Sequence, residues 1–221
     1  MRIMALTDFH GTYSMVPRLA RVAQQEDVEA IVVAGDITNF GPVSIASQII
    51  RGLLVVGAPV VWVPGNCDPP ELATHPNMPP HGIHFGTLMS RNIVFVGIGG
   101  ATPSPFPGML EYSEDRIHSE IMHLIDRIGE RDELILVTHV PPYGTSADVI
   151  YTGEHVGSEA LAQIAQEVRP SLILCGHIHE SRGVDRIDDT LVVNPGPAMN
   201  GLYAVVEGER GEWDARLGMI E

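Results

Sequence analysis

Short apolar runs alternate along most of the chain with stretches in which apolar residues recur at helical spacing. The runs are rich in β-branched residues, which is typical of buried strands. They predict strands at Arg2–Thr7, Ala30–Ala34, Val60–Val63, Ile93–Val96, Leu134–Val137 and Leu172–Leu174. The periodic stretches between them predict helices at Val16–Gln25, Val43–Val55, Ser113–Ile128 and Gly157–Glu167.

The chain after Arg182 has a different pattern, with short alternating segments separated by glycine and proline. Helices between the early strands and strands alone at the end predict an α/β fold, a layered α-β-β-α sandwich with two central sheets and a strand-rich C-terminal part. We find no internal repeat, low-complexity segment or linker, and therefore interpret residues 1–221 as a single domain. The C-terminal strands are expected to form an antiparallel meander, near Val184–Ile187, Thr190–Val193, Leu202–Val206 and Glu212–Leu217.

Three segments rich in proline and glycine are long for connections within a compact domain: Pro69–Gly82, Ala101–Gly108 and Pro141–Gly153. Loops of this length are usually lids or walls of a binding site. We expect Thr102–Tyr112 and Pro141–Thr152 to determine the choice of substrate.

All 13 basic residues are arginines, and with 28 acidic residues the formal charge is −15. The absence of lysine excludes Schiff-base enzymes, pyridoxal-phosphate attachment and P-loop nucleotide binding. The acidic charge disfavours nucleic acid and a membrane surface as partners, because binding to either depends on basic residues.

Two cysteines, Cys67 and Cys175, form no disulfide framework and favour a reducing compartment. The N-terminal residues 1–11 do not resemble a secretory signal, and the most apolar stretch, Leu53–Val63, is interrupted by Gly57 and Pro59. We therefore expect a cytoplasmic protein.

A polar side chain that can bind a metal ion follows five of the predicted strands within one to three positions. In open α/β sheets the carboxyl ends of the strands face the ligand crevice, so these side chains are expected to converge. Two of the five have a partner two positions further on, which in an extended backbone lies on the same side of the chain. The resulting set is Asp8, His10, Asp36, Asn66, His139, His177 and His179.

This set offers oxygen and nitrogen atoms and no thiolate, which suits Mn, Fe, Zn or Ni. Seven ligands exceed what one ion needs, so two ions that share one carboxylate fit the number better. If the protein binds phosphate, two divalent cations would supply the positive charge that lysine does not provide.

In these motifs the sequence resembles the calcineurin-like metallophosphoesterases. The motifs follow the order of that family: D-x-H at Asp8, G-D-x-x-N at residues 35–39, G-N-x-D at residues 65–68, a single strand-end His139, and G-H-x-H at residues 176–179. Within the family the chain is most similar to small prokaryotic phosphodiesterases related to the cyclic-AMP phosphodiesterase. The segments at residues 139–148 and 194–197 also resemble a branch of predicted phosphoesterases.

The resemblance implies a role for each of these positions. Asp8, His10 and His179 would hold one metal, Asn66, His139 and His177 the other, and Asp36 would bridge both. A hydroxide between the ions would attack phosphorus in line. Among the metals we expect Mn, with Fe, Zn or Ni as alternatives. The residues expected to take part in catalysis are Asp36, Asn66, Cys67, Asp68 and His139.

Two positions depart from the family pattern. Cys67 stands where many members have a histidine that assists the leaving group, and a thiol is a weaker hydrogen-bonding partner than imidazole. We therefore expect a preference for good leaving groups or dependence on another acid; a nucleophilic Cys67 is the less favoured alternative. Asn39 stands where many members have aspartate, and is expected to orient a ligand.

Other candidate residues are interpreted as structural. Cys175 lies in an apolar run and is expected in the core. Arg182 either contacts a phosphate oxygen or is structural, the second being favoured. Glycines flank the candidate ligands at positions 11, 35, 65 and 176, where tight turns are expected. The remaining histidines are expected on the surface or in loops, with one of them possible in the substrate pocket: His75, His81, His84, His118, His123 and His155.

The favoured function is a binuclear metal-dependent phosphodiesterase acting on a small phosphoester, such as a cyclic nucleotide or a nucleotide-derived diester. One alternative is a nuclease or a lipid-headgroup pyrophosphatase of the same superfamily, against which the charge of −15 argues. The other is a scaffold that keeps the fold without the chemistry, against which the complete ligand set argues.

Overall fold

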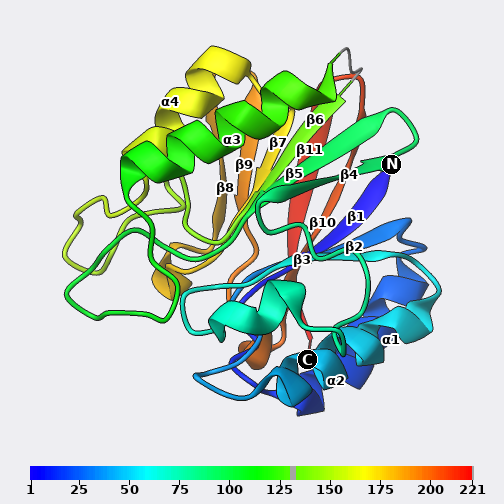
Figure 1. Ribbon diagram of the computed structural model, residues 1–221. Coiled ribbons are helices and arrows are strands. Elements are labelled where there is room, and N and C mark those ends of the chain that lie inside the picture. Colours follow the sequence, from blue (N-terminus) through cyan, green and yellow to red (C-terminus); the bar gives the residue numbers. More distant parts are fainter. Residues whose placement is uncertain (130–132, 221) are drawn as a thin grey trace.

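The computed structural model, which describes residues 1–129 and 133–220, places two β-sheets between two pairs of helices (Figure 1). Helices α1 (Val16–Gln25) and α2 (Val43–Leu53) cover one side, and α3 (Glu114–Ile128) and α4 (Glu159–Val168) cover the other. This is the predicted α-β-β-α sandwich, and the fold class is confirmed.

The first sheet has five strands in the order β11-β10-β1-β2-β3. Its strands β1 (Arg2–Leu6), β2 (Ala30–Ala34) and β3 (Val60–Val63) run parallel, as Ile3 opposite Ala30 and Ile31 opposite Val60 show. Strands β10 (Leu202–Glu209) and β11 (Glu212–Met219) extend it as an antiparallel hairpin that pairs with β1.

The second sheet has six strands in the order β4-β5-β6-β7-β9-β8. Strands β5 (Ile93–Ile98), β6 (Glu133–Thr138), β7 (Leu172–Leu174) and β9 (Thr190–Asn194) run parallel, and the outer strands β4 (Gly86–Ser90) and β8 (Gly183–Ile187) are antiparallel to their neighbours. Strand β4 was not predicted, because it lies at the edge of the sheet and its residues are half-buried or exposed, so that it contains no continuous apolar run.

The predicted C-terminal meander is wrong in its pairing, although all four strands exist. They form two separate hairpins, β8–β9 in the second sheet and β10–β11 in the first. Between the hairpins the chain crosses from one sheet to the other at residues 195–201. Local alternation identifies a strand but contains no information about which sheet it joins.

Three layers of apolar side chains hold the sandwich together. One lies between α1, α2 and the first sheet, a second between the two sheets, and a third between the second sheet and α3 and α4. Alternate residues of β2 show the arrangement: Ile31 packs toward the helices, whereas Val32 packs between the sheets. Strands buried on both faces explain the continuous apolar runs in the sequence.

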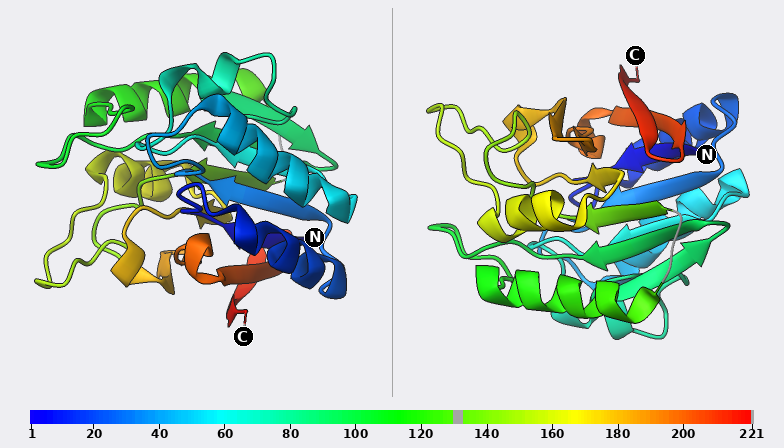
Figure 2. Two further views of the ribbon diagram at one scale, coloured as in Figure 1. Left: turned by 90° about the horizontal axis from the view of Figure 1, so that it is seen from below. Right: turned by 90° about the horizontal axis from the view of Figure 1, so that it is seen from above.

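The helix boundaries agree with the sequence pattern to within a few residues. Ser113 caps α3 by accepting a hydrogen bond from the N–H of Arg116 at 3.3 Å, and Ser158 caps α4 in the same way. Loops 102–112 and 141–158 extend beyond the strand ends, on the side away from the N-terminus (Figure 2). In residues 1–129 and 133–220, no helix is long and apolar enough to cross a bilayer.

Candidate metal centre

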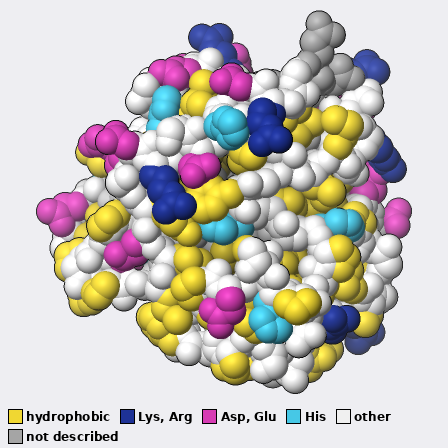
Figure 3. Space-filling model, in the orientation of Figure 1, with side chains coloured by type: hydrophobic (Ala, Val, Ile, Leu, Met, Phe, Trp, Pro, Cys, Tyr) yellow, Lys and Arg dark blue, Asp and Glu magenta, His cyan; other side chains and the backbone are white. Residues whose placement is uncertain are grey.

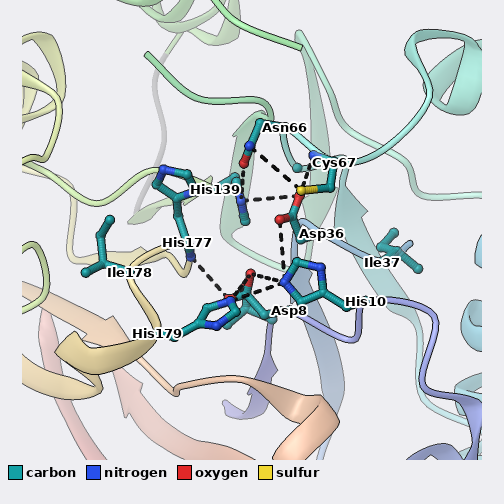
Figure 4. A network of polar contacts seen from close by, with 12 residues as sticks. Asp8, His10, Asp36, Ile37, Asn66, Cys67, His139, His177, Ile178 and His179 are labelled. Carbon is teal, nitrogen blue, oxygen red and sulfur yellow. Dashed lines mark hydrogen bonds and ion pairs between the residues drawn. The ribbon is translucent and has the colours of Figure 1, made fainter. Parts of the chain in front are cut away.

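The side chains that follow β1, β2, β3, β6 and β7 meet at one end of the sandwich (Figure 4). The structure brings all seven predicted residues into one network of contacts. Ligand atoms of five of these side chains, together with Cys67, form overlapping groups, each within 4.8 Å: Asp8, His10 and His179; Asp8, Asp36 and His139; and His10, Asp36 and Cys67.

The turns that carry these side chains are not extended. The φ angles are +54° for Asp8, +44° for His10, +47° for Asp36 and +70° for His177. We expected an extended backbone to place Asp8 and His10 on one side; left-handed turns do so instead. Such conformations are unfavourable outside glycine, and their concentration here is typical of a functional site.

Asp8 is almost fully buried, and its two oxygens have different surroundings. Oδ2 accepts hydrogen bonds from Thr7 Oγ1 at 2.9 Å and from the N–H of His177 at 3.1 Å. Oδ1 is buried and receives no hydrogen bond from the residues that the structure describes, while Nε2 of His179 lies 3.4 Å away and Nε2 of His10 3.7 Å away. A buried carboxylate oxygen without a donor is costly unless a cation binds it.

Asp36 lies between two groups of side chains. Its Oδ1 accepts the N–H of Cys67 at 2.8 Å and lies 3.4 Å from Nε2 of His139, whereas Oδ2 lies 3.7 Å from Nε2 of His10. Burial disfavours the charge of Asp36, but His139 and the Cys67 N–H outweigh burial and hold the pKa below its usual range. The position of its two oxygens suits a bridging ligand.

His139 is fully buried and its ring orientation is determined by the backbone. Nδ1 donates to the carbonyl of Ala34 at 2.7 Å, which turns Nε2 toward Oδ1 of Asn66 at 3.1 Å. Burial lowers the pKa of His139, but Asp36 and Asp8 outweigh it and raise the pKa to about 9. The site therefore attracts positive charge.

His177 lies beside His139, with ring centroids 5.0 Å apart. Burial and the neighbouring His139 lower the pKa of His177 to about 4, so this ring is neutral at pH 7. A neutral imidazole is the form that binds a metal ion. Among the described residues, however, His177 belongs to none of the compact ligand groups.

The donor set fits divalent cations. Two ligands each about 2.1 Å from one ion, at about 90–110° to each other, are about 3.0–3.4 Å apart. Nε2 of His10 and Nε2 of His179 lie 3.2 Å apart, and Oδ1 of Asn66 and Nε2 of His139 lie 3.1 Å apart. Imidazole and carboxylate donors around an oxygen without a hydrogen bond form a suitable site for such ions.

Cys67 is half-buried beside the centre, and Asn66 Nδ2 lies 3.8 Å from its sulfur. Burial and the carboxylates Asp36 and Asp68 raise the pKa of this thiol. A thiol held in its neutral form is a poor nucleophile, which disfavours the alternative in which Cys67 attacks phosphorus.

Asp68 does not face the centre. It is fully buried and accepts backbone N–H groups of Ile37 at 3.0 Å, Thr38 at 2.6 Å and Gly65 at 2.8 Å. Burial and the nearby Asp36 raise its pKa to about 6. Asp68, grouped above with the catalytic residues, joins the turns after β2 and β3 and is a positioning residue. Asn39, expected to orient a ligand, is exposed.

Gly65 is required for the close contact between these two turns. A Cβ at this position would collide with Oδ1 and the backbone nitrogen of Asp36. Gly65 therefore confirms the prediction that a glycine next to a candidate ligand allows a tight turn, because any side chain here would clash with Asp36.

Arg182 does not contact the centre. Its Nε donates to the carbonyl of Pro195 at 3.0 Å and its Nη2 to the carbonyl of Gly218 at 2.9 Å, so the structural interpretation is confirmed. His84 is not a surface histidine: Nδ1 accepts the N–H of Gly99 at 2.9 Å and Nε2 lies 3.1 Å from the Tyr112 hydroxyl.

Sequence reasoning missed two supporting residues. Thr7 donates to Asp8, and Asn194 Nδ2 donates to the carbonyl of Ile178 at 2.9 Å, which holds the turn between His177 and His179. A signal existed for Asn194, because it begins the N-P-G-P segment at residues 194–197. Thr7 had no signal beyond its place next to Asp8.

Comparison with known proteins shows what the chain is similar to. The family model of the calcineurin-like phosphoesterases matches residues 1–181. An uncharacterized protein of Methanocaldococcus jannaschii is 35% identical over 209 residues, which cover 92% of this chain and 91% of that protein. The 3′,5′-cyclic adenosine monophosphate phosphodiesterase CpdA of Pseudomonas aeruginosa is 26% identical over 202 residues, 88% of this chain and 69% of that protein.

The fold is also similar to solved structures. A crystal structure of a Thermus thermophilus protein superposes with a TM-score of 0.75 and 20% identity, covering 97% of each chain. At this identity the likeness concerns the fold.

Proposed function

Because the chain belongs to the calcineurin-like phosphoesterase family, we propose that it is a metal-dependent phosphodiesterase that hydrolyses a small diester such as a cyclic nucleotide or a nucleotide-derived compound. The observation on which the proposal depends is the buried Oδ1 of Asp8, which faces two imidazoles and receives no hydrogen bond within residues 1–129 and 133–220. The 26% identical relative that is a cyclic-AMP phosphodiesterase supports a diester as substrate.

In this proposal the centre holds two ions, with Mn as the expected metal and Fe, Zn or Ni as alternatives. Asp8, His10 and His179 would hold one ion and Asn66, His139 and His177 the other, with Asp36 between them. When bound, the ions would lower the pKa of a water nucleophile and neutralise charge that develops on the phosphoryl oxygens.

The protein's own residues then keep this arrangement rigid. Asp68 accepts three backbone hydrogen bonds and so fixes the position of the turn that carries Asp36 relative to the turn that carries Asn66. The Ala34 carbonyl holds His139 with Nε2 toward the centre. Cys67, as a neutral thiol, can donate only a weak hydrogen bond, so departure of the leaving group would depend mainly on its own stability.

An assay tests the proposal directly. The metal-free protein is loaded with Mn²⁺, Ni²⁺ or Zn²⁺, its metal content is measured by elemental analysis, and aryl phosphodiester and monoester hydrolysis are compared. We expect two ions per chain and faster turnover of the diester. Asp36→Asn should abolish turnover, whereas the control Asp126→Asn, at an exposed position on α3, should not change it. Protein that holds two ions and hydrolyses no diester would contradict the proposal.

The alternatives lead to different results. A nuclease would degrade single-stranded or duplex DNA, which a chain of charge −15 is not suited to bind. A scaffold would fold normally and contain no metal when purified.

A further inference from the structure

Two exposed phenylalanines lie on loops that are attached directly to the candidate metal centre. The Phe40 side chain is 58% exposed and that of Phe106 is 85% exposed. An exposed aromatic ring offers a flat π face on which a ring of a ligand can stack.

Phe40 combines exposure with an unfavourable backbone. Its φ is +53°, which is rare for a bulky residue, and its N–H donates to the carbonyl of Cys67 at 2.9 Å. Neither exposure nor strain stabilises the fold, so their coincidence at the centre indicates a function for the ring.

Phe106 lies on a loop that is attached to Asn66, the residue next to Cys67 in the turn that follows β3. The N–H of Met109 donates to the carbonyl of Asn66 at 2.6 Å, and a Cβ at Gly108 would lie only 2.7 Å from that of Asn66. Two loops therefore attach to consecutive residues, Asn66 and Cys67, of the turn that follows β3.

The loop of Phe106 is pre-organised. Ser104 Oγ accepts the N–H of Phe106 at 3.1 Å and donates to its carbonyl at 2.9 Å, and prolines flank it at positions 105 and 107. The Tyr112 end of the loop is held by His84, with the Arg116 guanidinium 4.6 Å from the Tyr112 ring centroid. An exposed ring on a rigid loop loses little entropy when it binds a ligand.

The loops of Phe40 and Phe106 and a third loop after β6 contain no basic side chain. Residues 36–43, 102–112 and 140–158 contain no arginine or lysine, whereas they include Glu111, Asp148 and Glu154. In Figure 3 the outer left edge of the molecule shows hydrophobic and acidic side chains. The surroundings of the centre therefore suit an uncharged, ring-bearing group and disfavour a second phosphate.

We propose that Phe40 and Phe106 form an aromatic binding site for the ester group that stays on phosphorus, so that the enzyme prefers diesters in which this retained group carries an aromatic ring and which contain a single phosphate. This inference rests on the phosphodiesterase activity proposed above. A nucleobase and a simple aryl group share the required flat π face.

The test uses three diesters that release the same p-nitrophenolate, so that only the second ester group differs: methyl, phenyl and 5′-thymidyl p-nitrophenyl phosphate. We expect kcat/KM to be at least about ten-fold higher for one or both ring-bearing esters than for the methyl ester. A gain with phenyl alone assigns the site to simple aryl groups, and a gain with the thymidyl ester assigns it to nucleosides.

Two variants remove the rings while keeping the backbone. Phe40→Asn suits a left-handed residue, and Phe106→Leu retains an apolar side chain. Each should raise KM for the preferred ring-bearing ester by about 5- to 100-fold and leave kcat/KM for the methyl ester within about two-fold. Met89→Ala, at a 66% exposed position on β4, is the control and should change neither substrate.

The outcomes separate the two proposals. No hydrolysis of the methyl ester by the metal-loaded wild type contradicts the phosphodiesterase activity itself. Hydrolysis of all three esters without a ring preference, or an equal loss for all three in both variants, contradicts the aromatic site alone. A 3′-phosphate added to the thymidyl ester should lower kcat/KM, and an increase would overturn the preference for a single phosphate.

Discussion

Nε2 of His10 and Nε2 of His179 lie 3.2 Å apart, although 169 positions separate the two residues in the chain. Each nitrogen also lies within 3.7 Å of Oδ1 of Asp8. Two imidazole nitrogens directed at one carboxylate oxygen are the arrangement that a shared cation stabilises.

Loss of one of these nitrogens should remove one ion. His179→Ala is expected to hold about one Mn²⁺ per chain where the wild type holds two, measured by elemental analysis after gel filtration. His123→Ala, exposed on α3, is the matched control and should keep two. Unchanged metal content in His179→Ala would show that His179 is not a ligand.

Asp68→Asn should separate positioning from metal binding. The amide has one accepting oxygen in place of two, so at least one of three buried N–H groups loses its partner. We expect the free energy of unfolding to fall by about 1–3 kcal/mol and kcat to fall more than KM rises. Urea unfolding and kinetics measure both, with Asp126→Asn as the control; unchanged stability would argue against the role.

Cys67→His should extend the range of leaving groups. An imidazolium can donate a proton to the leaving group, whereas the neutral thiol does not. The kcat/KM for a diester with a poor alkyl leaving group should therefore rise by about 10- to 100-fold relative to the kcat/KM for a diester that releases p-nitrophenolate. The ratio of kcat/KM for the two classes is the measurement. An unchanged rate and preference would mean that position 67 takes no part in departure of the leaving group.

Arg182→Ala should affect stability and not substrate binding. The guanidinium donates to two backbone carbonyls, so its loss should cost about 1–3 kcal/mol of unfolding free energy. KM for a diester should stay within about two-fold of the wild-type value. A large rise in KM with unchanged stability would instead restore the phosphate-binding interpretation.

His84 should make stability depend on pH. Burial, together with the positive charge of Arg116, lowers its pKa to about 4 in the folded protein, from about 6.5 in an unfolded chain. As the pH falls, the unfolded state therefore takes up a proton before the folded state does. The contribution of neutral His84 to the free energy of unfolding is complete above about pH 6.5 and is lost as the pH falls toward 4.

The His84→Gln variant isolates this contribution. Between pH 7 and pH 4.5 the wild type should lose about 1–3 kcal/mol more unfolding free energy than His84→Gln does. Urea unfolding at the two pH values measures the difference. Equal losses in both proteins would show that His84 is not responsible.

Most of the fold could be predicted from the sequence because its strands are buried on both faces. Runs such as Ala30–Ala34 and Val60–Val63 read as strands with the bounds that the structure has. The edge strand Gly86–Ser90 was missed, since only half of it faces the core. The partners of the C-terminal hairpins were also missed, because pairing depends on contacts between distant segments.

The composition of the site could be predicted, but its geometry could not. Adjacent parallel strands of one sheet bring Asp8 and Asp36 together at their carboxyl ends, and His139 follows a strand of the second sheet that ends on the same side. The turns around them are left-handed, and Asp68 accepts hydrogen bonds from backbone N–H groups. Both features depend on local hydrogen bonds that no spacing pattern encodes.

The candidate ligands come from both sheets. Asp8, His10, Asp36 and Asn66 follow strands of the first sheet, whereas His139, His177 and His179 follow strands of the second. In the proposed arrangement each ion takes ligands from both, so neither ion has a complete site until both halves of the molecule have assembled. Metal uptake would then be a late step of folding, and a chelator would act on the contact between the sheets as well as on catalysis.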